Sequence, residues 1–150
     1  MFNDLYQAVI LDHYRTPSNV GQIEGAQQVR NDHPSCGDKV LLSVLVEDGI
    51  VTDIAFQGEG CSISQASLSL MTEAVKGQSV DVIRRLYDGF REMIHGQEPD
   101  EELLGDMVAL QGVSRFVARV PCAMLGWETL AQVLPLDAPA AEPDPSCEPG

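Results

Sequence analysis

The chain has 150 residues, of which 44% are hydrophobic, and a formal net charge of −14 from 9 basic and 23 acidic residues. This length suits one domain that buries roughly two thirds of the surface its unfolded form exposes, so folding needs neither a disulfide nor a metal. The negative charge argues against nucleic-acid binding, because a phosphate backbone would be repelled. No apolar run approaches the ~20 residues of a membrane span. The N-terminus lacks the basic and apolar regions of a signal peptide, so we expect a cytoplasmic protein.

The first half of the sequence predicts a helix followed by antiparallel strands. Apolar residues recur at intervals of three and four after Asn3, which can cap a helix, and later segments are rich in β-branched residues. Leu41 and Leu45 lie on the second face of one strand, which is typical of a central strand. The predicted elements are a helix ended by Pro17, an edge strand near Ala26–Arg30, and strands Lys39–Glu47 and Ile50–Gln57 joined by an Asp48-Gly49 hairpin turn.

The second half changes to helical periodicity. The predicted elements are a helix from Ser62 to a stop at Gly77, a helix Val80–Ile94 closed by Gly96, a short helix Asp100–Leu110, a connection Gly112–Arg119, and a last helix Cys122–Leu134. Residues 135–150 are dominated by Pro, Ala, Asp and Glu and predict a disordered acidic tail. We therefore expect one α+β domain over residues 1–134, with about three antiparallel strands packed against helices.

Four cysteines are the candidate chemical groups. They are Cys36, Cys61, Cys122 and Cys147, and no two of them form a C-x-x-C pair. Disulfides between them are not expected, because the cytoplasm is a reducing compartment. Cys61 and Cys122 each stand at a predicted helix start, where unpaired N–H groups and a positive partial charge favour a thiolate. The alternative is that each is a small buried apolar residue, as lone cysteines often are.

Cys36 favours a shared metal site. It stands in an irregular polar segment, between Pro34 and Gly37, which is an unusual place for a core cysteine. Gly37 gives the backbone enough freedom for Cys36 and Asp38 to turn towards one point. Three thiolates and a carboxylate suit tetrahedral Zn²⁺, and they also suit an iron–sulfur cluster.

Three segments carry a family resemblance. Cys36-Gly37-Asp38, the run from Gly58 to Ser67 (GEGCSISQAS) and the run from Arg119 to Trp127 (RVPCAMLGW) resemble, in order, the signature segments of the IscU/NifU N-terminal superfamily. The resemblance runs from about Phe2 to Leu134. Within the superfamily the sequence is similar to the SufU branch, because Pro121 replaces a His before the last cysteine and Arg119 lies three residues before that cysteine. A longer helical stretch between Cys61 and Cys122 is also similar to that branch.

The resemblance implies an SufE/NifU-like fold and a zinc-dependent sulfurtransferase of iron–sulfur cluster assembly. Cys36, Asp38, Cys61 and Cys122 would be the zinc ligands. Cys36 would leave the metal and accept persulfide sulfur from a SufS-type cysteine desulfurase, whose side chain would replace it, and a downstream scaffold would receive the sulfur. By its charge, Arg119 is a candidate to act beside Cys36, either by balancing four anionic ligands around one dication or by pairing with Asp38 when metal is absent. The alternative is an ordinary surface arginine near a helix start. Cys61 and Cys122 would be fixed anchors and Asp38 a replaceable closing ligand.

Two other functions compete with this one. The same four ligands could hold a nascent [2Fe–2S] cluster on a scaffold, or the zinc could be purely structural. The remaining candidates have ordinary interpretations: His33 as a solvent-facing loop residue, and His13 and His95 as boundary or polar-face residues of helices. Cys147 has nothing nearby that would activate its thiol.

Overall fold

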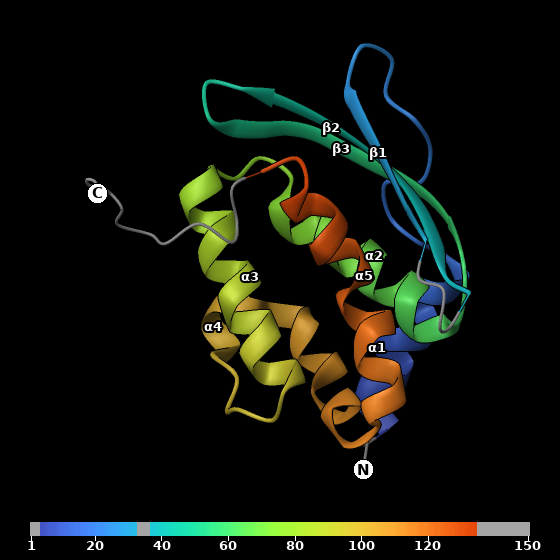
Figure 1. Ribbon diagram of the computed structural model, residues 1–150. Helices are drawn as coiled ribbons and strands as arrows, with labels where there is room; N and C mark the ends of the chain where they lie inside the picture. Colours follow the sequence, from blue (N-terminus) through green and yellow to red (C-terminus); the bar gives the residue numbers. More distant parts are fainter. Residues whose placement is uncertain (1–3, 33–36, 135–150) are drawn as a thin grey trace.

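The computed structural model describes residues 4–32 and 37–134 and has the predicted α+β architecture (Figure 1). Predictions that concern Asn3, His33, Cys36 and the segment 135–150 lie outside these residues. The elements are α1 (Asp4–Arg15), β1 (Gln27–Asp32), β2 (Lys39–Glu47), β3 (Ile50–Glu59), α2 (Ser62–Val75), α3 (Val80–Ile94), α4 (Glu101–Leu104), the 3₁₀ segments η1 (Gly105–Arg115) and η2 (Val117–Arg119), and α5 (Val120–Ala131).

The sheet is an antiparallel meander in the order β1-β2-β3. Asp48 and Gly49 both have positive φ, as a tight hairpin between β2 and β3 requires, so the turn prediction is confirmed. The central position of β2 is also confirmed. One face of β2 is buried through Val40, Leu42 and Val44, and on the other face Leu41 and Leu45 are half-buried.

The helices cover one face of this sheet (Figure 1). α2 packs against β3, and α5 packs against both β1 and β2. α2 and α5 also pack against each other, while α1 lies along α2. Trp127 of α5 is fully buried and stacks on Phe90 of α3, with ring centroids 5.6 Å apart. The core therefore lies between the sheet and the α2–α5 pair. None of the helices in the described residues is long and apolar enough to cross a membrane.

Three predicted elements in the second half of the chain need correction. The α-helix expected over Asp100–Leu110 ends at Leu104, because Gly105 takes φ +55° and the chain continues as the 3₁₀ segment η1. Gly112–Arg119, expected as a connection, belongs largely to η1 and η2. The last helix begins at Val120 rather than at Cys122, with Pro121 in its first turn. Pro is tolerated there because the first N–H groups of a helix have no internal partner.

Candidate metal centre

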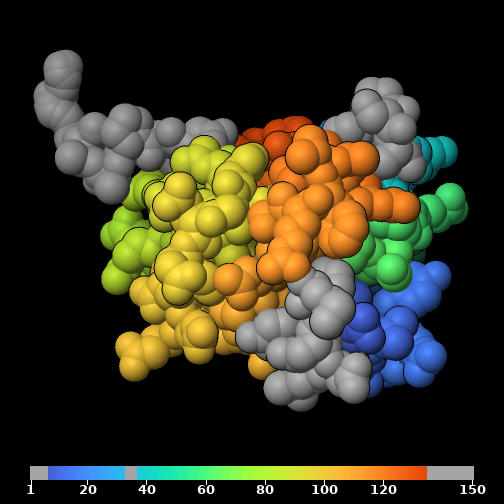
Figure 2. Space-filling view, turned by 90° about the horizontal axis from the view of Figure 1, so that it is seen from below, coloured from blue at the N-terminus to red at the C-terminus, as the bar shows by residue number. Residues whose placement is uncertain are grey.

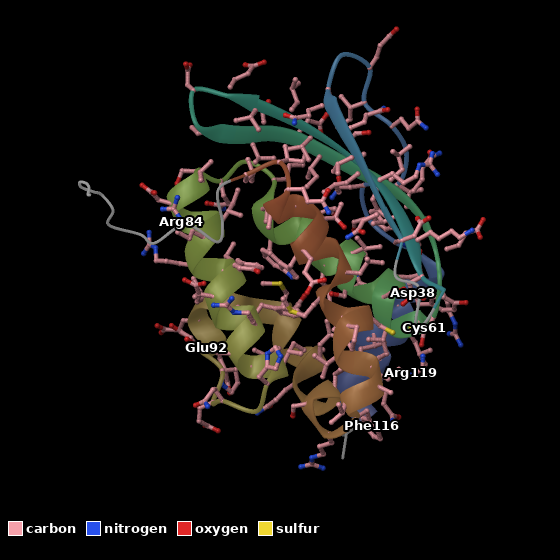
Figure 3. All side chains as sticks on the ribbon, in the orientation of Figure 1. Asp38, Cys61, Arg84, Glu92, Phe116 and Arg119 are labelled. Atoms are coloured by element: carbon pink, nitrogen blue, oxygen red, sulfur yellow. The ribbon has the colours of Figure 1, made fainter. Side chains whose placement is uncertain are left out.

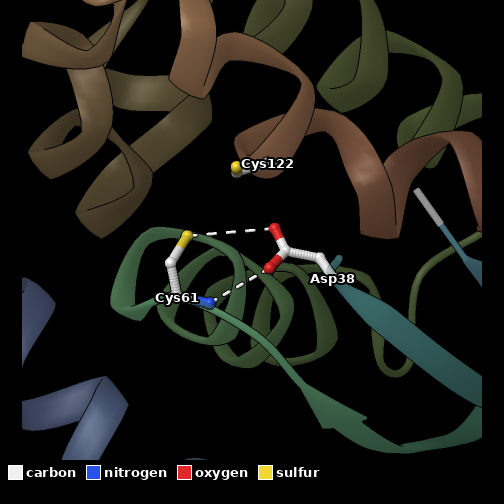
Figure 4. Close-up of side chains that lie close together, drawn as sticks. All are labelled: Asp38, Cys61 and Cys122. Carbon is white, nitrogen blue, oxygen red and sulfur yellow. Dashed lines mark hydrogen bonds between the residues drawn. The ribbon is translucent and has the colours of Figure 1, made fainter. Parts of the chain in front are cut away.

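Three of the four predicted ligands come together at one end of the sheet. Asp38 directly precedes β2, Cys61 is the N-cap residue of α2, and Cys122 lies in the first turn of α5. Their ligand atoms all lie within 4.8 Å of one another. Figure 4 shows the two sulfur atoms and the carboxylate facing a common point. The fourth predicted ligand, Cys36, lies outside the described residues.

The carboxylate of Asp38 is held firmly in this cluster. Asp38 is 1% exposed, and its Oδ1 accepts a hydrogen bond of 3.1 Å from the backbone N–H of Cys61. Oδ2 lies 3.8 Å from Cys61 Sγ. One oxygen therefore caps the start of α2, where a negative charge is favoured, and the other faces the thiols.

The loop before Cys61 is built around this carboxylate. A Cβ atom on Gly60 would lie 2.2 Å from Asp38 Oδ1 and 2.6 Å from Ser64 Oγ, so the position admits no side chain. A Cβ on Gly58 would lie 2.8 Å from the backbone oxygen of Lys39. These two glycines therefore provide the backbone clearance that the loop before Cys61 needs.

The two helices that carry Cys61 and Cys122 are locked together near the site. Ser67 of α2 donates a buried hydrogen bond of 2.6 Å to the carbonyl oxygen of Ala123, the residue after Cys122. Close approach of the helices needs Gly126, because a Cβ there would lie 2.6 Å from the Leu68 side chain. The positions of the two sulfur atoms are thus fixed by helix packing and not by the ends of loops.

Arg119 provides a positive charge at the edge of the cluster. It is exposed at the N-cap of α5, and its pKa is raised above the ordinary value of an arginine. The first cause is a hydrogen bond with Cys122, and the negative charges of Cys61 and Cys122 add to it. Figure 3 shows Arg119 next to Cys61 and Asp38, on the opposite side of the molecule from Arg84 and Glu92 of α3.

The donor set fits a zinc ion. With Zn–S of ~2.3 Å and Zn–O of ~2.0–2.2 Å, two ligands at a tetrahedral angle lie roughly 3.5–3.8 Å apart. The separation of 3.8 Å between Cys61 Sγ and Asp38 Oδ2 agrees with this spacing. Two soft sulfurs with one hard oxygen are ligands that Zn²⁺ accepts, and one further ligand would complete a tetrahedron.

The two described histidines lie away from this centre, as expected. Nδ1 of buried His13 is 2.7 Å from Ser69 Oγ, which makes it a satisfied side chain between α1 and α2. His95 is exposed at the end of α3, where its Nδ1 is 2.8 Å from the carbonyl oxygen of Arg91.

Comparison with known proteins now decides the family. The NifU-like N-terminal domain matches residues 5–132. The chain belongs to this family. It is 45% identical over 127 residues to the zinc-dependent sulfurtransferase SufU of Bacillus subtilis strain 168, covering 84% of this chain and 86% of that one. It is 42% identical over 139 residues to the iron–sulfur cluster assembly scaffold protein IscU of Streptococcus pyogenes serotype M1, covering 92% and 87%.

Solved structures agree with the family assignment. The crystal structure of FiSufU from Fervidobacterium islandicum AW-1 superposes with a TM-score of 0.78 and 32% identity, over 84% of this chain and 93% of that one. The resemblance inferred from the three sequence segments is therefore confirmed, and the chain is a member of the iron–sulfur cluster assembly proteins of the IscU and SufU type.

Sequence reasoning missed two groups near the centre. Ser64 is fully buried beneath the Gly60 loop and donates to the carbonyl oxygen of Cys61 at 3.1 Å. Its position three residues after an N-cap was the available signal. Phe116 and Val117, interpreted as part of a connection, are exposed large apolar side chains close to Arg119 in sequence. Their position between two arginines was the available signal.

Proposed function

We propose that this chain is a zinc-dependent sulfurtransferase that accepts persulfide sulfur from a SufS-type cysteine desulfurase and passes it to an iron–sulfur scaffold. The cluster of Asp38, Cys61 and Cys122 with Arg119 at its edge is the observation that carries the proposal. Similarity to the zinc-dependent sulfurtransferase SufU supports it.

The zinc ligands in this proposal are Asp38, Cys61, Cys122 and Cys36. When bound, the ion supplies Lewis-acid stabilisation that keeps thiolates deprotonated at neutral pH. The chain contributes two sulfur donors fixed by the packing of α2 on α5, and a carboxylate fixed by the Cys61 N–H group. Cys36 follows Pro34 and precedes Gly37, and it is the ligand that we assign to sulfur acceptance.

The transfer itself is a thiol–disulfide type of exchange. The thiolate of Cys36 attacks the terminal sulfur of the donor's persulfide, and a new S–S bond forms on Cys36. The S–S bond of the donor breaks, and its electron pair leaves with the donor's cysteine thiolate, so there is no net oxidation. Arg119 is exposed beside the thiols, and its guanidinium can form an ion pair with the negatively charged persulfide that results.

The test compares Cys36→Ala with Cys147→Ala as a matched cysteine control. After incubation with desulfurase and cysteine, mass spectrometry should find an added sulfur atom on Cys36 in wild type and in Cys147→Ala. Cys36→Ala should gain none and should not accelerate the desulfurase. The acceptor assignment is wrong if Cys36→Ala accelerates the desulfurase as well as wild type does.

The second candidate function is a scaffold that holds a [2Fe–2S] cluster on the same ligands, and the similarity to IscU of Streptococcus pyogenes favours it. Metal content separates the two. Near-stoichiometric zinc in anaerobically purified protein, without visible absorption from iron, supports the sulfurtransferase. Iron and inorganic sulfide at two per chain would instead support the scaffold.

A further inference from the structure

An exposed apolar pair stands beside the metal centre. Among the large apolar residues that the structure describes, Val117 is the most exposed, at 81%. Its neighbour Phe116 is 55% exposed. Scattered single apolar residues are normal on a protein surface. These two are consecutive, and the segment Arg115–Arg119 that contains them, called the docking segment below, leads straight into the helix that carries Cys122.

The exposure is built into the local backbone. The N–H of Phe116 donates to the carbonyl oxygen of Val113 at 2.8 Å, and the N–H of Arg119 donates to the carbonyl oxygen of Phe116 at 2.7 Å. Val113 is buried and anchors the segment from the side of η1. The structure therefore holds the two apolar side chains out towards solvent, although burying them would be favourable.

The docking segment also lies on the accessible side of the centre. Asp38 and Cys122 are each 1% exposed, whereas Cys61 is half-buried and Arg119 is exposed. Figure 3 shows Cys61, Arg119 and Phe116 following one another down the same side of the molecule. In Figure 2 the orange residues of η1, η2 and the start of α5 occupy the middle of the face seen from below.

Charge distinguishes this surface from the rest of the chain. The protein has 23 acidic residues, yet none lies between Met107 and Trp127, where Arg115 and Arg119 are the charged residues. The docking segment is thus a small positive and apolar surface on a strongly negative protein. Its complement is a protein surface with an apolar recess bordered by carboxylates.

We infer that the docking segment is the binding surface for the protein that delivers sulfur to this centre, an inference that rests on the proposed function. Phe116 and Val117 enter an apolar recess of the donor, and Arg115 pairs with a carboxylate at its rim. Arg119 is left beside the thiols, where it faces the sulfur that is being transferred.

The experiment measures desulfurase turnover as a function of the concentration of this chain, with holo-desulfurase and cysteine. The variants are Phe116→Ser/Val117→Ser and Arg115→Glu. The matched controls are Ile50→Ser and Arg85→Glu. Ile50 is an exposed apolar residue at the far end of β3, roughly 30 Å along the strand from Cys61, and Arg85 is an exposed arginine on α3.

The double variant should raise the half-saturating concentration of this chain at least tenfold, because an interface anchor mainly affects binding. The maximal desulfurase turnover, the zinc content and the thermal midpoint should stay unchanged. Arg115→Glu should raise the half-saturating concentration severalfold, and more strongly at low salt. The controls should stay within twofold of wild type.

The outcomes separate the two levels of the proposal. If wild type accelerates the desulfurase and the double variant does so with the same half-saturating concentration, the docking inference alone is wrong. If wild type neither gains sulfur nor accelerates the desulfurase, the proposed function fails and the docking inference fails with it. If sedimentation shows that wild type self-associates and the double variant does not, while desulfurase binding is unchanged, a second copy occupies the surface and the inference is wrong.

Discussion

The substitution Gly60→Ala tests how closely the chain packs around Asp38. The new methyl group would start 2.2 Å from Asp38 Oδ1, 2.7 Å from Asp38 Cγ and 2.6 Å from Ser64 Oγ. Optimal non-bonded separations are about 3.5–4.0 Å, so the carboxylate has to move by about 1 Å. That movement lengthens the 3.1 Å hydrogen bond from the Cys61 N–H and takes Oδ2 out of its place opposite Cys61 Sγ.

Two quantities should fall as a result. Overpacking a buried site typically costs about 1–3 kcal/mol, so the free energy of unfolding of the metal-free protein should drop by this amount. Loss of a partner that orients a metal ligand typically lowers metal affinity by about 10–100-fold, and we expect the zinc affinity of Gly60→Ala to fall within that range.

The assay combines urea unfolding of the metal-free protein with chelator competition for zinc. Gly89→Ala is the control, because Gly89 lies inside α3 and its Cβ would meet only the side chains of Leu103 and Leu104, at 3.3 Å and 3.5 Å. Its zinc affinity should match wild type. Unchanged zinc affinity in Gly60→Ala, at wild-type stability, would refute the idea that the Gly60 loop positions Asp38.

Substitutions at three further positions test the site and the core. Asp38→Asn should keep the fold, because an amide oxygen can still accept from the Cys61 N–H, but should lower zinc affinity at least tenfold in chelator competition, since a neutral amide is a poorer ligand. Arg119→Ala should slow sulfur uptake at least tenfold in the mass-spectrometric assay while zinc content stays at the wild-type value, because the guanidinium interacts with thiols and is no metal ligand. Trp127→Ala should cost about 3–5 kcal/mol in urea unfolding, as a large fully buried side chain does. Trp127→Phe should cost less, because the indole Nε1 has no hydrogen-bond partner in the described part of the chain.

Local sequence signals predicted most of the elements. Strand β2 and helix α3 have the predicted bounds, because alternation of apolar residues defines the first, and Ser79 and Gly96 define the ends of the second. The helix predicted over Asp100–Leu110 is present, but it is α-helical only to Leu104, because Gly105 takes φ +55° and the chain continues as a 3₁₀ helix. The buried residues of η1, such as Met107 and Leu110, reach the core from a 3₁₀ segment with a similar spacing.

The end of β3 that lies away from the hairpin turn was not predicted correctly, because it depends on strand pairing. β3 was expected to end at Gln57 but extends to Glu59, because Lys39 of β2 pairs with Glu59. The pairing depends on a register shift between Leu45 and Val46, and no residue pattern in the sequence signalled this irregularity. A shift of one residue changes which side chains face one another across the strands, so the neighbours of Asp38 were not predictable from the turn alone.

The register shift also explains how Asp38 meets Cys61. Val46 pairs with Val51 near the turn, and without the shift the same register would pair Lys39 with Gly58 and place Asp38 opposite Glu59. With the shift, Lys39 pairs with Glu59, and Asp38 comes next to Gly60, where the absence of a side chain admits the carboxylate. The Cys61 N–H then binds it. The sequence resemblance suggested a replaceable Asp38, but a carboxylate fixed by hairpin register, glycine clearance and a helix N-terminus is better suited to stay while another ligand exchanges.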